Sequence, residues 1–205
     1  MKKYWILLLL SAFLFSCSSK NDKDFYSAAK LHEKKGENNL AIKEFEKVVN
    51  KYPKSSIADS SLFRIAKLEI DNKNYVNALR DFKKFTENYP NSKLMTAALF
   101  ELGKLYHGKV LKEIPEKKSL KTAVKYYKEV FHRDKNFPDA PQALFMAGFL
   151  EANELHEYKN AKKTYGLFIK TYPNNELVAS AKTELKTIGM SPEEILRKAG
   201  KLYNK

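Results

Sequence analysis

The stretch SLFRIAKL, residues 61–68, decides the fold because close copies of it recur along the chain. ALFELGKL follows 37 residues later, at 98–105, and ALFMAGFL follows a further 45 residues on, at 143–150. In each copy the apolar residues are spaced three and four positions apart, which predicts one face of an amphipathic helix. Recurrence at this period predicts an array of similar structural units.

A second kind of segment with helical period alternates with these copies: VNALRDFKKF at 76–85 follows the first copy, and LAIKEFEKVV at 40–49 precedes it. Small residues recur late in the first segments and early in the second, and an aromatic residue follows four positions later. We expect the small residues to let two antiparallel helices approach closely, with the aromatic ring beside the crossing. The positions are Ala29, Ala66, Gly103 and Gly148; Ala41, Ala78, Ala123 and Ala161; and Phe45, Phe82, Tyr127 and Tyr165.

A proline motif follows each helix pair. The four motifs are YPKS (52–55), YPNS (89–92), FPDA (137–140) and YPNN (172–175). Because proline cannot continue the helical hydrogen bonding, we expect each second helix to end just before it. The pattern predicts an all-α solenoid of four full helix pairs, with a partial fifth and a capping helix over 194–203.

The third unit is longer than the others. Twelve residues separate the two small positions in the first two units, but 20 separate Gly103 from Ala123. The eight extra residues lie within 107–120. Long loops of repeat proteins often bind partners, and a surface loop that binds nothing is also tolerated, since it costs little closure entropy.

The first helices also carry a recurring polar and aromatic pattern. An aromatic residue precedes a lysine, or in the last unit a phenylalanine, by four positions, so that both share a helix face. This face is a candidate concave surface for an acidic or C-terminal peptide; alternatively, the aromatic side chains pack between neighbouring units. The residues are Tyr26, Lys30, Phe63, Lys67, Phe100, Lys104, Phe145 and Phe149.

The N-terminus has the features of an export signal. Lys2 and Lys3 precede an apolar run over 4–15 that is shorter than the roughly 20 residues needed to span a bilayer. We expect residues 1–16 to be the signal peptide. Cys17 follows as the single cysteine, which excludes an intrachain disulfide.

The segment LFSC, residues 14–17, resembles the lipobox of bacterial lipoproteins. The resemblance implies a covalent lipid on Cys17 and no other cofactor; the alternative is an unmodified cysteine after an ordinary signal. Residues 17–23 would then be a lipidated tether. Ser18 resembles the pattern of lipoproteins sorted to the outer membrane, although inner-membrane retention stays open.

Net charge and motif content restrict the function further. The chain carries a formal net charge of +14, but nearly all of it comes from lysine, spread over the helices. Arginine is the preferred side chain for reading bases and phosphates, so we expect no nucleic-acid partner. The four histidines form no metal-binding pair, and phosphate loops and nucleophile turns are missing, so we expect neither an enzyme nor a metal site.

The repeats from 24 to about 186 resemble tetratricopeptide (TPR) repeats, and we assign 24–205 to one TPR-like domain. The YPxS ending is similar to that of outer-membrane β-barrel assembly lipoproteins, the BamD-like family. This resemblance implies a scaffold on the periplasmic side of the outer membrane that binds other envelope proteins, among them a barrel insertase complex. The alternative is a peptide-binding lipoprotein in cell-wall or Tol-Pal processes.

Overall fold

The computed structural model describes residues 20–191 and 193–197, which form helices and no strand. Most of the expected capping helix, and residues 1–19 with Cys17, lie outside these ranges; residues 193–197 are helical. The helices are α1 (Asp22–Lys34), α2 (Asn38–Lys51), α3 (Ala58–Asp71), α4 (Tyr75–Asn88), α5 (Met95–His107), α6 (Glu116–Arg133), α7 (Ala140–Phe149), η1 (Leu150–Glu154, a π-helix), α8 (Tyr158–Thr171) and α9 (Val178–Thr187).

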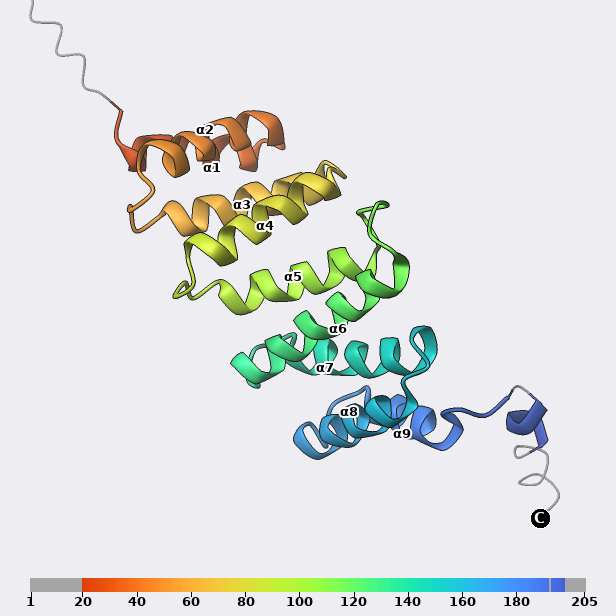
Figure 1. The fold of residues 1–205 in the computed structure, drawn as a ribbon. Coiled ribbons are helices and arrows are strands. Elements are labelled where there is room, and N and C mark those ends of the chain that lie inside the picture. Colours follow the sequence, from red (N-terminus) through yellow and green to blue (C-terminus); the bar gives the residue numbers. More distant parts are fainter. Residues whose placement is uncertain (1–19, 192, 198–205) are drawn as a thin grey trace, which may run out of the picture.

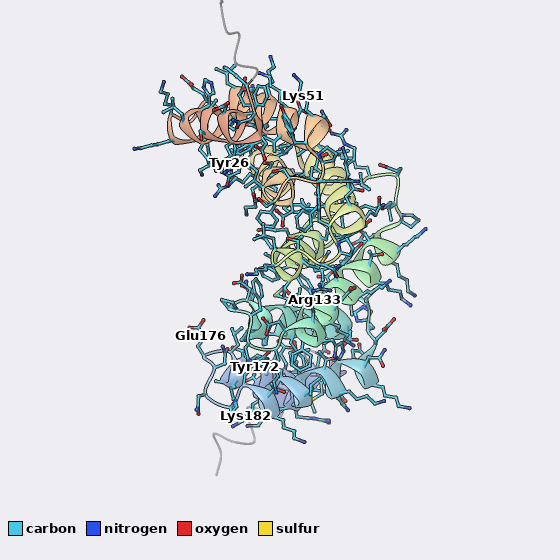
Figure 2. The ribbon with its side chains drawn as sticks, turned by 90° about the vertical axis from the view of Figure 1, so that its left-hand side faces the viewer. Tyr26, Lys51, Arg133, Tyr172, Glu176 and Lys182 are labelled. Carbon is cyan, nitrogen blue, oxygen red and sulfur yellow. The ribbon has the colours of Figure 1, made fainter. Side chains whose placement is uncertain are left out.

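Consecutive helices pair and stack along one axis (Figure 1), with their main contacts to neighbours in the sequence. Seen edge-on in Figure 2, the stack curves. The first helices of the units, α1, α3, α5 and α7, line the concave side, and the second helices, α2, α4, α6 and α8, form the convex side. The predicted solenoid of four helix pairs and a partial fifth is confirmed.

The small and aromatic positions form the centre of each unit, as expected. The alanines and the four second-helix aromatics are almost completely inaccessible to solvent. A Cβ atom added to Gly103 would lie 2.7 Å from the ring of Tyr127, and one added to Gly148 would lie 2.9 Å from the ring of Tyr165. The two helices of these units therefore approach as closely as a glycine permits.

The expected alignment of FPDA with the other proline motifs is wrong by three residues. In every unit the residue that follows the second helix donates its N–H to a carbonyl four residues back, and that residue is Tyr52, Tyr89, Asp134 or Tyr172. Asp134 thus takes the tyrosine position, and Pro138 lies further on, beside the start of α7. The Asp134 carboxylate accepts the N–H of Asn136 at 2.9 Å, so a side chain shapes this turn without proline.

The turn inside each unit contains one residue in the left-handed conformation. It is a glycine only in the first unit, at Gly36; elsewhere it is Lys73, Lys109 or His156, with φ of 63°, 54° and 55°. A glycine at this position is typical of a helix end. The other three carry a side chain where glycine is favoured, so residue type alone did not reveal them.

A buried carboxylate connects the last two full units. Glu151, in η1, is 1% exposed. It accepts hydrogen bonds from the Lys128 ammonium of α6 and the Thr164 hydroxyl of α8, both at 2.6 Å. A buried charge needs such partners, and here they hold α6 and α8 side by side.

Candidate functional site

The aromatic residues of the predicted concave stripe point into their own units. Tyr26 contacts Phe45, and Phe63 contacts Phe82, each with ring centroids 5.4 Å apart. Phe100 and Phe145 meet Tyr127 and Tyr165 in the same way, at 6.0 and 5.5 Å. The rings therefore pack against the second helix of the same unit, not between units. Phe149 is also partly buried against the core.

The lysines of the stripe face acidic side chains that sequence reasoning missed. Lys67 of α3 and Lys104 of α5 approach the Glu101 carboxylate at 2.7 and 2.9 Å. Lys30 pairs with Glu33, which also receives Arg64 from α3 at 2.8 Å. These ion pairs connect adjacent first helices across the concave surface. Glu33 and Arg64, like Lys67 and Glu101, lie more than 30 residues apart, so spacing within one helix could not reveal them.

Glu101 is the electrostatic centre of this surface. Its side chain is 10% exposed. Burial alone would raise the pKa of Glu101, but the hydrogen bonds and charges of Lys67 and Lys104 outweigh it and hold the pKa below its ordinary value. Lys104 also lies over the Phe100 ring, with its nitrogen 5.6 Å from the centroid. Glu101 thus stays ionised at neutral pH and holds both lysines in place.

The insertion of the third unit is anchored rather than free. His107 ends α5 and Glu116 begins α6, so only 108–115 lie between the helices. Val110, Leu111 and Ile114 pack against the main core. The Lys109 ammonium closes the loop by approaching the Glu116 carboxylate at 2.6 Å. The insertion therefore has a defined shape and can form the wall of a site.

A pocket joins the insertion to the lysine–glutamate cluster. Its volume is about 280 Å³, comparable to small ligand sites in proteins. Apolar side chains from the α3–α4 turn, the end of α5 and the insertion line it, with Glu101 and Lys104 at its edge. The lining residues are Ile70, Tyr75, Glu101, Lys104, Leu105, Gly108 and Val110. The two regions singled out from the sequence, concave stripe and insertion, thus meet at one place.

The described part of the chain contains neither a candidate metal site nor a candidate membrane-spanning helix. No group of three histidine, cysteine or carboxylate side chains in 20–191 and 193–197 could hold a metal ion. None of the helices described is both long and apolar enough to cross a membrane.

These features define a TPR-type α-solenoid whose exposed surfaces, rather than an enclosed cleft, offer the sites for partners. Residues 18–190 match the family YfiO, described as outer membrane lipoprotein. The chain belongs to this family. Among curated proteins, none matches the chain.

Solved structures with the same fold are distant in sequence. A tetratricopeptide repeat protein from Parabacteroides merdae has a TM-score of 0.64 at 13% identity; the alignment covers 81% of this chain and 59% of that protein. The apo form of RapI gives 0.59 at 18%, covering 92% and 71%. MamA from Desulfovibrio magneticus gives 0.54 at 16%, covering 76% and 78%. At such identities the similarity establishes the TPR fold alone.

Proposed function

We propose that the protein is a lipid-anchored TPR scaffold on the periplasmic side of the outer membrane, acting in outer-membrane protein assembly without catalysing a reaction. Membership of an outer membrane lipoprotein family over 18–190 carries this proposal. Cys17, one residue before the matched region, is the proposed lipid attachment site. The partners are other envelope proteins, and a barrel insertase is the first candidate.

The pocket beside the insertion is the proposed contact point. An apolar side chain of the partner enters between Tyr75 and Val110, while an acidic group approaches Lys104 and Lys67 on the concave surface. Because Glu101 already binds both lysines, the acidic group competes with an internal carboxylate. Partner binding here depends on apolar burial first and on charge second.

A mild-detergent pull-down of the full-length protein tests this function. The expected result is co-purification of a barrel insertase, together with loss of barrel proteins from the outer membrane when the scaffold is depleted. Recovery of cell-wall or Tol-Pal proteins instead, with normal barrel levels, would support the alternative lipoprotein role.

The same pull-down tests the pocket by comparing one variant with a matched control variant. Tyr75 and Tyr158 both begin a second helix and are 42% and 40% exposed, but only Tyr75 lines this pocket. Tyr75→Ala should lose the partner while Tyr158→Ala keeps it. If both variants retain the partner equally, the pocket is not the contact point, whatever the partner's identity.

Lipid attachment is tested separately by Cys17→Ala. We expect this variant to lack the mass added by acyl chains and to leave the membrane fraction after a wash in about 0.5 M salt, which screens binding by charge. A variant that stays membrane-bound with unchanged mass would remove Cys17 as the anchor.

A further inference from the structure

Positive charge is concentrated on the convex side of the third and fourth units. Helix α6 carries five lysines and an arginine against two glutamates, and α8 carries four lysines and no acidic residue. The concave helices of the same units differ: α5 has one lysine and one glutamate, and α7 has no lysine, arginine or acidic residue. The charge thus belongs to one side of the molecule.

The lysines of α6 and α8 lie on two successive convex helices that are connected to each other. The Glu151 carboxylate accepts hydrogen bonds from Lys128 of α6 and Thr164 of α8. The Lys121 ammonium of α6 also approaches the Glu157 carboxylate, at the start of α8, at 3.0 Å. Seven exposed lysines remain that make no ion pair within the residues the structure describes. These seven are the lysine face: Lys117, Lys118, Lys125, Lys159, Lys162, Lys163 and Lys170.

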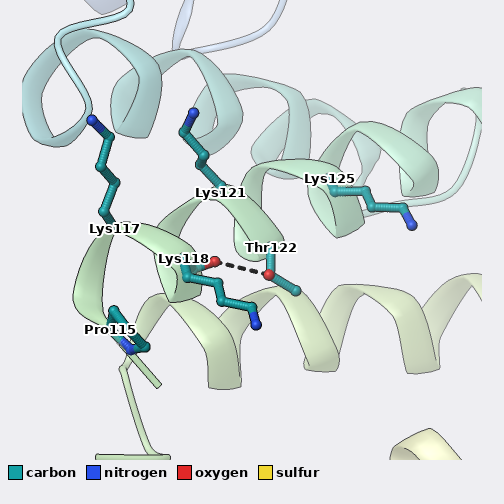
Figure 3. A pocket seen from close by; sticks show the side chains of 6 residues that line it. All are labelled: Pro115, Lys117, Lys118, Lys121, Thr122 and Lys125. Carbon is teal, nitrogen blue, oxygen red and sulfur yellow. Dashed lines mark hydrogen bonds between the residues drawn. The ribbon is translucent and has the colours of Figure 1, made fainter. Parts of the chain in front are cut away.

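The surface is shallow where α6 contributes to it. Figure 3 shows Lys117, Lys118, Lys121 and Lys125 around an open hollow of about 460 Å³, with Lys117 and Lys121 pointing toward the ribbon of the following unit. The Thr122 hydroxyl donates to the Lys118 carbonyl, and no acidic residue lines the hollow, whose walls are Pro115, Thr122 and the four lysines.

Repulsion between neighbouring lysines destabilises α6 and α8. Lys121 and Lys125 are four residues apart on α6, and Lys159 and Lys163 on α8, so like charges face each other along each helix. An opposing sheet of negative charge would relieve the repulsion. We propose that the lysine face binds the surface of an anionic phospholipid bilayer.

A bilayer fits these residues better than an acidic protein does. Lysine is a hydrated point charge with a flexible stem and suits many shifting headgroups, whereas a defined carboxylate site favours the arginine fork. Leu167, 38% exposed, lies among the lysines of α8 and can enter the interface while the lysine stems extend around it. Membership of an outer membrane lipoprotein family is consistent with a bilayer close to this surface.

Vesicle flotation of the full chain carrying Cys17→Ala tests the proposal without a covalent lipid. Binding is compared between phosphatidylcholine vesicles and vesicles that also contain phosphatidylglycerol. We expect binding to the anionic vesicles to be about tenfold stronger in 0.1 M salt, and the difference to disappear in 0.5 M salt. The N-terminus, with Lys2 and Lys3, is the same in every variant, so the comparison between variants removes its contribution.

Two quadruple variants with equal charge change locate the effect. Lys118→Gln, Lys125→Gln, Lys162→Gln and Lys163→Gln together should abolish the preference for anionic vesicles. Lys34→Gln, Lys54→Gln, Lys93→Gln and Lys112→Gln, all at exposed positions elsewhere, should leave it within about twofold.

Equal loss in both variants would mean that net charge, not the lysine face, binds the membrane. Equal binding of the unsubstituted protein to both vesicle types would overturn the proposal and leave this face for an acidic protein. Because Cys17 is absent from the assay, neither result bears on lipid attachment, and the two proposals fail separately.

Discussion

At the scale of single residues, the ring that fills each helix crossing is matched to the residue opposite. Phe45 and Phe82 occur in units with alanine at the small position, whereas Tyr127 and Tyr165 occur in units with glycine. The two tyrosine rings occupy the space of the missing Cβ atom. The helix crossings are therefore packed by two kinds of residue pair, alanine with phenylalanine and glycine with tyrosine.

Gly103→Ala should destabilise the protein. Its Cβ would overlap the buried Tyr127 ring, which cannot move aside freely, and overpacking of this kind costs about 1–3 kcal/mol. Gly166→Ala is the control, since nothing lies within 4 Å of the added atom on α8 and alanine favours helix by up to about 1 kcal/mol. Urea unfolding of the purified proteins should show opposite shifts.

Asp81 is a carboxylate whose burial opposes ionisation. Burial raises the pKa of Asp81 from its ordinary value of 3.8; Arg80 lowers it, and Glu69 raises it further. A raised folded pKa gives stability below the unfolded value that is lost as pH rises through the folded value. Asp81→Asn should therefore be more stable than the natural protein at pH 7, and the difference should shrink toward pH 3.8. Thermal unfolding across this range measures it; a constant difference would exclude titration as the cause.

At the scale of elements, the proline loops connect successive units through side chains. The Ser92 hydroxyl donates to the Asp59 carboxylate at 2.6 Å, and Ser55 donates to Asp22 in the same way at 2.5 Å. The hydroxyls of Tyr89 and Tyr172 donate to carbonyls in the loop before their own helix pair, at Pro53 and Lys135, and the Tyr52 hydroxyl donates to the Lys20 carbonyl just before α1. The YPxS motif therefore binds neighbouring units together as well as ending a helix.

Ser55→Ala should destabilise the protein, because it removes a charge-assisted hydrogen bond to Asp22. That bond lowers the pKa of Asp22, so its contribution is present above pH 3.8 and is lost as pH falls through the folded value. The neighbouring Ser56, exposed on the same loop, is the control. Urea unfolding should separate the two variants at pH 7 but not at pH 2; equal stability at pH 7 would show that the bond contributes nothing.

Helix periodicity predicted the elements well because the 37-residue repeat imposes the same apolar pattern in each unit. It failed at FPDA, where a proline was taken as the marker although Asp134 makes the turn. The candidate surface was predicted only in part. The spacing identified Lys67 and Lys104, but 34 residues separate Lys67 from Glu101, and only packing shows that one carboxylate meets both lysines.

At the scale of the whole molecule, each unit depends mainly on its neighbours. Helix α9 covers the second apolar cluster, which includes Phe168 of α8, through Val178 and Ala181. A chain ending at residue 176 should therefore lose hydrogen-exchange protection in α8 while α1 to α4 keep theirs. Uniform loss along all helices would instead indicate a single cooperative unit.

The 37-residue period bears on how long such a molecule can be. Residues 57–93 contain a complete helix pair together with Asp59 at the start and Ser92 at the end, the two partners of a hydrogen bond that joins the two ends of the unit. A second copy inserted after residue 93 would therefore offer each neighbour the same junction that it meets now. The reach of the solenoid, and with it the length of the segment that its concave surface could hold, is adjustable by duplication in steps of one unit.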